Sequence, residues 1–173
     1  MPRGFMNARH GGTNVPMVRT VAYATGQTFK RGALLIDNAA GTYQECIGDA
    51  PAIAGVALQG AGTGPGYDVS GTPTVVTGRV QEVSMLDAAP LTEFSGRAVN
   101  GAVDPVLPLQ THIGELYPVK KVADDWVIDM TPVVSPAVPA NRIEITDIDA
   151  DAKMFLFKFL SSVISGQGGP STA

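Results

Sequence analysis

The chain of 173 residues has few of the side chains from which most catalytic and metal sites are built. It contains two histidines, His10 and His112, and one cysteine, Cys46. A zinc site needs several cysteine or histidine ligands, and no GxSxG sequence is present to carry a catalytic serine. We therefore expect no catalytic residue, no metal site and no cofactor. We interpret Cys46 as a small buried side chain and His112 as a solvent-facing or hydrogen-bonded loop residue.

Charge and long apolar runs are also scarce. Charged residues make up 16% of the chain, against about 25% in typical domains, and the formal net charge is -4. No basic stripe exists, so we expect no nucleic-acid partner. No apolar run approaches the roughly 20 residues of a membrane-spanning helix, and Met1–Gly4 lacks the apolar core of a signal peptide, so we expect no membrane partner. A single cysteine excludes a disulfide within the chain, which suits assembly in a reducing cytoplasm.

Glycine and proline, in contrast, are abundant. The chain has 20 glycines and 13 prolines spread along its length, which favours short strands joined by turns. Residues 116–122 and 126–130 read as a hairpin, and residues 142–148 alternate polar and apolar side chains. Residues 153–160 place three phenylalanines on one face of a strand. We predict a mainly β fold, a small barrel or sandwich of short antiparallel strands and hairpins.

The segment 31–60 predicts a compact β-meander. Its apolar pieces are separated by a turn at 37–41, and Gly55 stands inside the third strand, where a glycine indicates a bulge, a barrel corner or a close backbone approach. The glycine-rich loop 60–66 fits no phosphate-binding register, and we interpret it as a flexible or close-packed loop. Residues 84–101 are less regular and could form one or two helical turns.

Carboxylates gather at two places without completing a known site. Asp147, Asp149 and Asp151 open a calcium-loop pattern, but Ala152 stands where that loop needs glycine and Lys158 where it needs glutamate. We interpret the three as soluble turn residues, with a weak metal contact shared between chains as the alternative.

The second group of carboxylates surrounds the single tryptophan. Asp124, Asp125 and Asp129 flank Trp126, an arrangement that also occurs in carbohydrate sites. One tryptophan with nearby aspartates is a weak signal, so we interpret Trp126 as a core or interface residue.

Several segments resemble a known family. RGALLIDNAAGTY (31–43) followed by AIAGVALQGAG (52–62) resembles the meander of tailed-phage capsid decoration, or cement, proteins. Residues 114–129, 142–145 and 155–160 also look like the C-terminal β-hairpins of phage virion proteins of this kind.

The resemblance implies a β-rich protein, often a homotrimer, on the outer surface of the virion capsid. It would bridge neighbouring subunits of the major capsid protein and resist the pressure of packaged DNA, without catalysis. Its partners would be the major capsid protein and further copies of itself, assembled in the host cytoplasm. The alternatives are another virion component, such as a tail, neck or fibre protein, or a carbohydrate-binding module or small β-barrel hydrolase.

We divide the chain into an extended N-terminal arm at 1–17, a β domain at 18–165 and a flexible tail at 166–173. The β domain is divisible into two sub-lobes, at about 18–110 and about 111–165. The arm is expected to lie across a neighbouring subunit; the alternative is a disordered terminus.

Two sets of side chains are candidates for protein contacts. In the arm, apolar and basic side chains are expected to bind the capsid: Arg3, Phe5, Met6, Arg9, Val15 and Met17. In the β domain, aromatic side chains are candidates for a subunit interface: Trp126, Phe155, Phe157 and Phe159.

Overall fold

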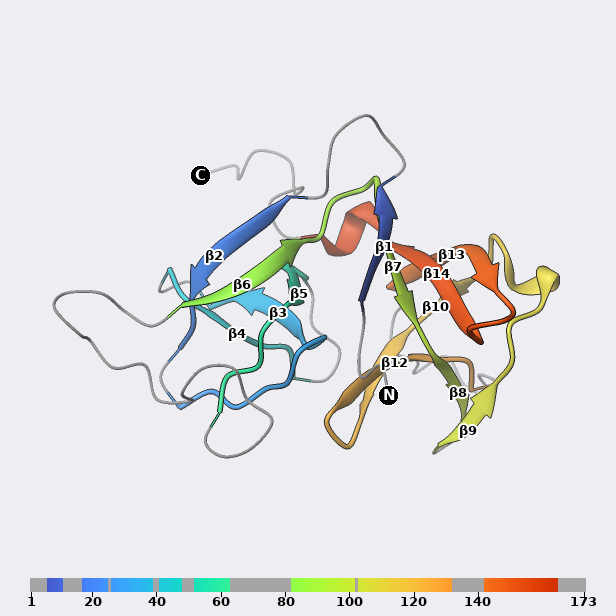
Figure 1. Cartoon of the computed structure of the whole chain (residues 1–173), viewed down its shortest axis with the longest axis horizontal. Coiled ribbons are helices and arrows are strands. Elements are labelled where there is room, and N and C mark those ends of the chain that lie inside the picture. Colours follow the sequence, from blue (N-terminus) through green and yellow to red (C-terminus); the bar gives the residue numbers. More distant parts are fainter. Residues whose placement is uncertain are drawn as a thin grey trace, which may run out of the picture.

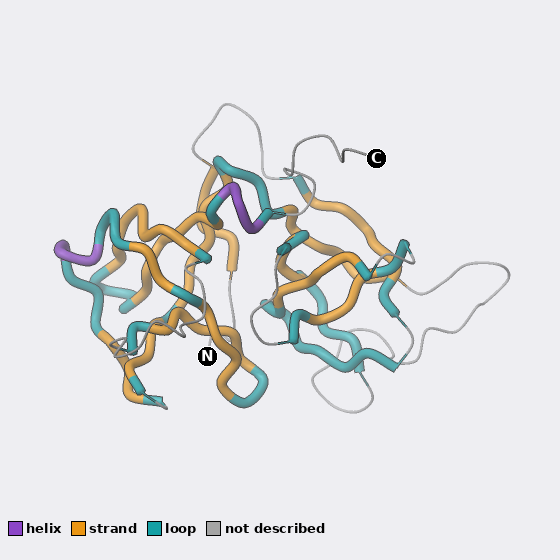
Figure 2. The backbone as a smooth tube through the Cα atoms, turned by 180° about the vertical axis from the view of Figure 1, so that it is seen from behind, coloured by secondary structure: helices purple, strands orange, loops and turns teal. Residues whose placement is uncertain are grey.

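The strands of the computed structural model form two lobes that lie side by side (Figure 1). Almost everything regular in the described chain is strand, apart from two single-turn 3-10 helices, η1 (Gln110–His112) and η2 (Ser161–Val163) (Figure 2). No helix among these residues is long and apolar enough to cross a membrane. The structure describes residues 6–10 (backbone only), 17–24, 26–38, 41–47, 52–62, 82–101, 103–131 and 142–164.

The first lobe is one antiparallel sheet of five strands. Their order across the sheet is β2 (Val18–Ala22), β6 (Glu82–Asp87), β5 (Gly55–Ala57), β3 (Leu34–Asp37) and β4 (Tyr43–Glu45). A single bridge between Tyr23 and Tyr43 then joins the two outer strands at one point, where Ala24 N donates to Tyr43 O over 2.8 Å. The sheet therefore curls toward a small barrel without closing.

The second lobe contains two sheets. The five-stranded sheet has the order β1 (Met6–His10), β7 (Thr92–Gly96), β14 (Met154–Phe159), β13 (Ile143–Asp149) and β10 (Leu116–Tyr117). The four-stranded sheet has the order β11 (Val119–Val122), β12 (Asp125–Asp129), β8 (Ala98–Asn100) and β9 (Asp104–Val106). All pairs are antiparallel except β12 with β8, which run parallel.

Two bent stretches of chain join these two sheets. β7 continues into β8 through Arg97, and β10 continues into β11 through Pro118, so each stretch pairs in one sheet before its bend and in the other after it. At the bends, Ile128 N donates to Arg97 O and Asp129 N donates to Pro118 O, each over 2.9 Å. Strands that change sheets at bends form the corners of orthogonal β-sandwiches and barrels.

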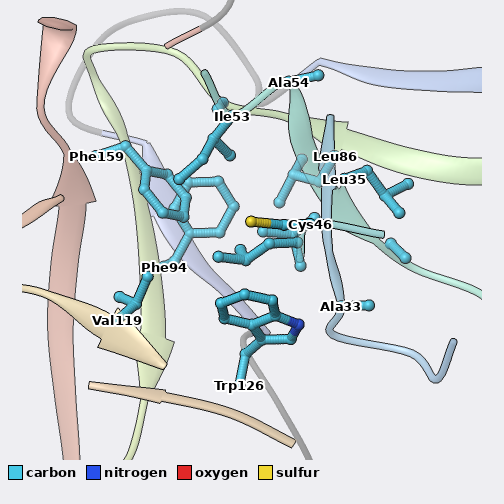
Figure 3. Packing of buried hydrophobic residues seen from close by; sticks show 14 of the residues in the cluster. Ala33, Leu35, Cys46, Ile53, Ala54, Leu86, Phe94, Val119, Trp126 and Phe159 are labelled. Carbon is cyan, nitrogen blue, oxygen red and sulfur yellow. The ribbon is translucent and has the colours of Figure 1, made fainter. Parts of the chain in front are cut away.

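One hydrophobic core runs through both lobes. Figure 3 shows Trp126, Phe94 and Phe159 of the second lobe facing Cys46 and Leu35 of the first. The chain after β14 strengthens this junction, because it returns to the first lobe.

At that return, Ile53 N donates to Val163 O over 2.6 Å, and Ile53 forms a parallel bridge with Ile164. The C-terminal end of the described chain is thus held between the lobes (Figure 1).

The predicted fold class is confirmed: the chain is mainly β and built of short, largely antiparallel strands. The predicted helical turns within 84–101 are wrong, because β6, β7 and β8 occupy this stretch. Thr92, Phe94 and Gly96 are buried and alternate with half-buried residues, a period of two that suits a strand.

The lobes divide the chain differently from the expected sub-lobes. The first lobe ends with β6 at Asp87 and the second begins again with β7 at Thr92, whereas the expected boundary was near residue 110. One part of the expected arm is also placed: β1, at residues 6–10, pairs with β7 in the chain's own sheet. The tail 166–173 and most of the glycine-rich loop lie outside the described residues.

Candidate interaction surface

Trp126 is a core residue and does not face a partner. Its ring is 1% exposed, and its indole nitrogen Nε1 donates to Glu45 Oε1 over 3.0 Å. A ring this buried offers little face for a sugar to stack on, which argues against the carbohydrate interpretation of Trp126. The candidate subunit interface at this residue is likewise corrected, because the side chain is covered by its own chain.

Glu45 connects the two lobes through a buried polar cluster. The carboxylate of this β4 residue accepts from Trp126 at one oxygen and from Lys121 Nζ at the other, over 2.8 Å. Lys30 and Asp124 form a second ion pair between the lobes, also at 2.8 Å, and the hydrogen bond from Lys30, together with its charge, lowers the pKa of Asp124. We call these five residues the clasp, since they hold the β11–β12 hairpin against the first lobe.

The three phenylalanines of β14 are also internal. Phe155, Phe157 and Phe159 are 0–1% exposed, and Phe157 and Phe159 pack against Phe94 of β7 with ring centroids 6.0 and 5.1 Å apart. The predicted shared face is therefore present, but it covers the core of one chain, and the proposed subunit interface at these residues is corrected.

The remaining polar candidates have ordinary structural roles. Asp149 Oδ1 accepts from Ala152 N over 2.8 Å and caps the β13–β14 turn, and no cluster of potential metal ligands occurs among the described residues. His112 Nδ1 accepts from Leu109 N over 3.1 Å, so the residue is hydrogen-bonded as expected, but it ends the single-turn helix η1 and does not lie in a loop. Cys46 is buried and forms no disulfide, and its burial confirms its prediction.

The candidate arm contacts remain predictions. The side chains of Arg3, Phe5, Met6, Arg9 and Val15 lie outside the described residues. Met17 is described, and it is 63% exposed at the start of the edge strand β2.

A groove that no motif indicated opens on the four-stranded sheet of the second lobe. Its volume is about 640 Å³, within the range of ligand and peptide sites. Most of its wall is apolar and comes from β8, β9, β12 and the loop after β9, and three charged residues, Arg97, Asp125 and Lys153, also line it.

Exposed apolar side chains continue from this groove along the outer border of the second lobe. The stretch from β9 to η1 runs along the side of the molecule that faces away from the first lobe, and β10 then leads back toward the middle (Figures 1 and 2). We call this set the apolar margin: Val103, Leu107, Leu109, Ile113 and Leu116, which are 60%, 58%, 57%, 37% and 44% exposed. Val103 and Leu107 belong to both the margin and the groove. Single exposed apolar residues are common, but five within fourteen residues beside a groove indicate a contact surface.

The outer edge of β9 is poorly suited to hydrogen bonding with a further strand. Val99 O accepts from Met130 N, so the backbone groups of Val99 point toward β12 and away from β9. Pro105, which lies opposite Val99, therefore turns its own backbone groups outward, and proline has no N–H to offer there. The edge is protected against strand pairing, and a partner would bind mainly through side chains.

The sequence analysis did not predict this surface because it considered catalytic, metal-binding and aromatic residues and not exposed aliphatic ones. The signal was present in V-D-P-V-L-P-L (103–109), where Pro105 and Pro108 exclude a central strand yet large apolar side chains persist.

Comparison of the chain with protein-family models, with curated proteins and with solved structures finds no match.

Proposed function

We propose that this chain is a structural binding protein that covers the outside of a phage capsid and cements neighbouring major capsid protein subunits. The observation that carries the proposal is the apolar margin together with the groove that it borders. Exposure of such a surface to water is unfavourable, and covering it with another protein lowers the free energy of the system. The resemblance of the β-meander to capsid decoration proteins supplies the identity of the proposed partner.

The arrangement of the lobes supports the proposal. A single core and the clasp join the lobes, so the margin is carried on one body that can transmit load between subunits. We propose a homotrimer, because three linked copies multiply modest contacts through effective concentration. Its test is light scattering, in which a trimer gives three times the 17.9 kDa of one chain.

Co-sedimentation with expanded, DNA-free heads of the encoding virus tests the capsid partner. Leu107→Glu with Leu109→Glu is expected to lower occupancy on the heads at least about tenfold, since charge in a buried contact is costly. Ile47→Glu is the matched control: Ile47 is 85% exposed and lies in the first lobe, so its occupancy should match that of the wild type. A wild-type chain that leaves heads bare contradicts the proposal, and binding to tails instead would favour the tail alternative.

A further inference from the structure

The groove on the four-stranded sheet has the features of a peptide site with a defined charge preference. Arg97 lies at the bend between β7 and β8, and Lys153 lies in the β13–β14 turn with φ +55°. The antiparallel register sets Phe155 opposite Gly96, so Arg97 follows at the level of Met154, and Lys153, the residue before Met154, lies at the same corner. Both side chains line the groove.

These two cations are available to a ligand. Both residues are exposed, and neither takes part in an ion pair within the described chain, where Lys30, Lys120, Lys121 and Lys158 each have a carboxylate. Asp125 is the one carboxylate among the groove residues that the structure describes, so the two cations outnumber it there.

Apart from these charged residues, the groove is lined by apolar side chains. Val99, Val106 and Val127 form part of its wall, and Val103 and Leu107 extend it onto the apolar margin. Because Pro105 prevents strand pairing at the edge, the occupant must be held by its side chains.

We infer that the groove binds an extended protein segment that carries medium-sized apolar side chains and a carboxylate at the end next to Arg97 and Lys153. An extended segment presents alternate side chains to one surface, so about five residues, spanning roughly 17 Å, would place apolar groups in the groove and acids at its corner. This inference deepens the proposed function, on which it rests for the source of the segment, an exposed acidic stretch of the capsid surface.

The probe is a capped five-residue peptide with valine at positions 1 and 3, aspartate at position 5 and serine between them, so that both valines and the carboxylate share one face. It is added to the isotope-labelled full chain up to about 5 mM and followed by amide NMR shifts. We expect saturable shifts confined to β8, β9, β12 and the β13–β14 turn. The same peptide with lysine in place of aspartate should bind several-fold more weakly. Absence of groove shifts with the acidic peptide, or equal binding of the two peptides, overturns the inference.

Charge variants sharpen the test. Arg97→Gln and Lys153→Gln are each expected to lower the affinity for the acidic peptide about three- to fivefold, which is the size of effect that loss of an exposed ion pair has. Arg97→Glu with Lys153→Glu should reverse the preference toward the lysine peptide, and Asp125→Asn should tighten the acidic one. Arg31→Glu, an exposed cation of the first lobe, is the control and should change neither affinity. Unaltered affinities in the groove variants contradict the inference.

The two proposals fail separately. If the acidic peptide binds the groove but the chain ignores heads, the groove serves another acidic partner and only the capsid proposal falls. If the chain binds heads and the groove variants bind them as well as the wild type, only the groove inference falls.

Discussion

Gly55 shows how one backbone position determines the packing of the first lobe. It is the first residue of β5, the central strand of its sheet, which lies between β6 and β3. A side chain at this position would meet the Leu86 carbonyl oxygen and would come within 2.7 Å of Met85 Cγ. The interior strand glycine of the sequence is therefore explained by close backbone approach.

Gly55→Ala is expected to lower the free energy of unfolding by about 3 kcal/mol, because the backbone of β6 cannot yield to the added methyl group. Gly41→Ala is the control: the site is open, and only its φ of +75° opposes a side chain, at a cost of about 1 kcal/mol. Urea denaturation measures both changes. A loss at Gly55 no larger than at Gly41 would show that β5 and β6 are less closely packed than described.

Asp129 gives the protein a defined sensitivity to acid. Burial raises the pKa of this carboxyl group, but hydrogen bonds from Thr131 and Lys120 outweigh burial and hold the pKa below its ordinary value. A depressed pKa in the folded state contributes stability above the unfolded pKa of about 3.9, and this contribution is lost as the pH falls through the folded pKa.

The free energy of unfolding should therefore fall as the pH drops below about 4, and Asp129→Asn should make this fall shallower. Thr131→Ala removes one donor, raises the pKa of Asp129 toward its ordinary value, and should give an intermediate slope. Denaturant titrations over a pH series measure the slopes. If the free energy of unfolding falls equally with pH in the wild type and in both variants, groups other than Asp129 cause the acid sensitivity.

At the scale of elements, the clasp couples the edge strand β4 to the β11–β12 hairpin of the other lobe. Glu45 is buried, and removal of its carboxylate would leave the Trp126 indole N–H without an acceptor in the core. An unsatisfied buried donor is more costly than the net value of the hydrogen bond that it loses.

Glu45→Ala is expected to destabilise the chain by about 2–3 kcal/mol. In a double-mutant cycle with Trp126→Phe, the coupling energy should reach about 1–2 kcal/mol. Lys121→Met tests the more exposed end of the clasp, where the side chain is 33% exposed, and should cost less than about 1 kcal/mol. Additive effects of the Glu45 and Trp126 substitutions would argue that the hydrogen bond contributes little.

Elements near the C-terminus were predictable, and their connections were not. The hairpin of residues 116–130 appears as β11 and β12, with Ala123 in its turn at φ +54°, and β14 follows the predicted alternation, whereas β13 follows it only as far as Ile145, where a bulge shifts the register. The bend at Pro118 divides the expected first strand of this hairpin between two sheets. Local periodicity determines which face of a strand is apolar, but partners distant in sequence decide where the strand bends.

The residues that contact distant partners were harder to predict than the strands. In the sequence, Glu45 is one polar residue among β-forming residues. Its neighbours in the sequence do not indicate that Trp126, in the other lobe, donates a hydrogen bond to it. The candidate interface was predicted from aromatic content, yet the aromatic residues fill the core and the exposed surface consists of aliphatic side chains such as Leu107 and Leu109. Aromatic residues carry large apolar area, and burial within the chain competes with burial against a partner for the same residues.

At the scale of the whole molecule, the continuous core makes the two lobes one unit of folding. Trp126 is the single tryptophan and lies at the junction of the lobes, so its fluorescence reports their contact (Figure 3). Neither lobe keeps this core covered without the other.

Unfolding followed by Trp126 fluorescence and by far-ultraviolet circular dichroism should therefore give coincident transitions in denaturant. Separate midpoints, with the fluorescence change first, would show that the lobes part before their sheets melt. The Glu45→Ala variant is the informative comparison, because any tendency of the lobes to separate should be largest when the clasp is broken.

The bend at Arg97 has a mechanical consequence. The stretch from β7 to β8 belongs to both sheets of the second lobe, and it passes the groove at the point where it turns. A pull applied there is divided between two ladders of hydrogen bonds whose strands run in different directions. No single direction of tension can break the hydrogen bonds of both ladders one after another. We therefore expect this corner to resist mechanical unfolding.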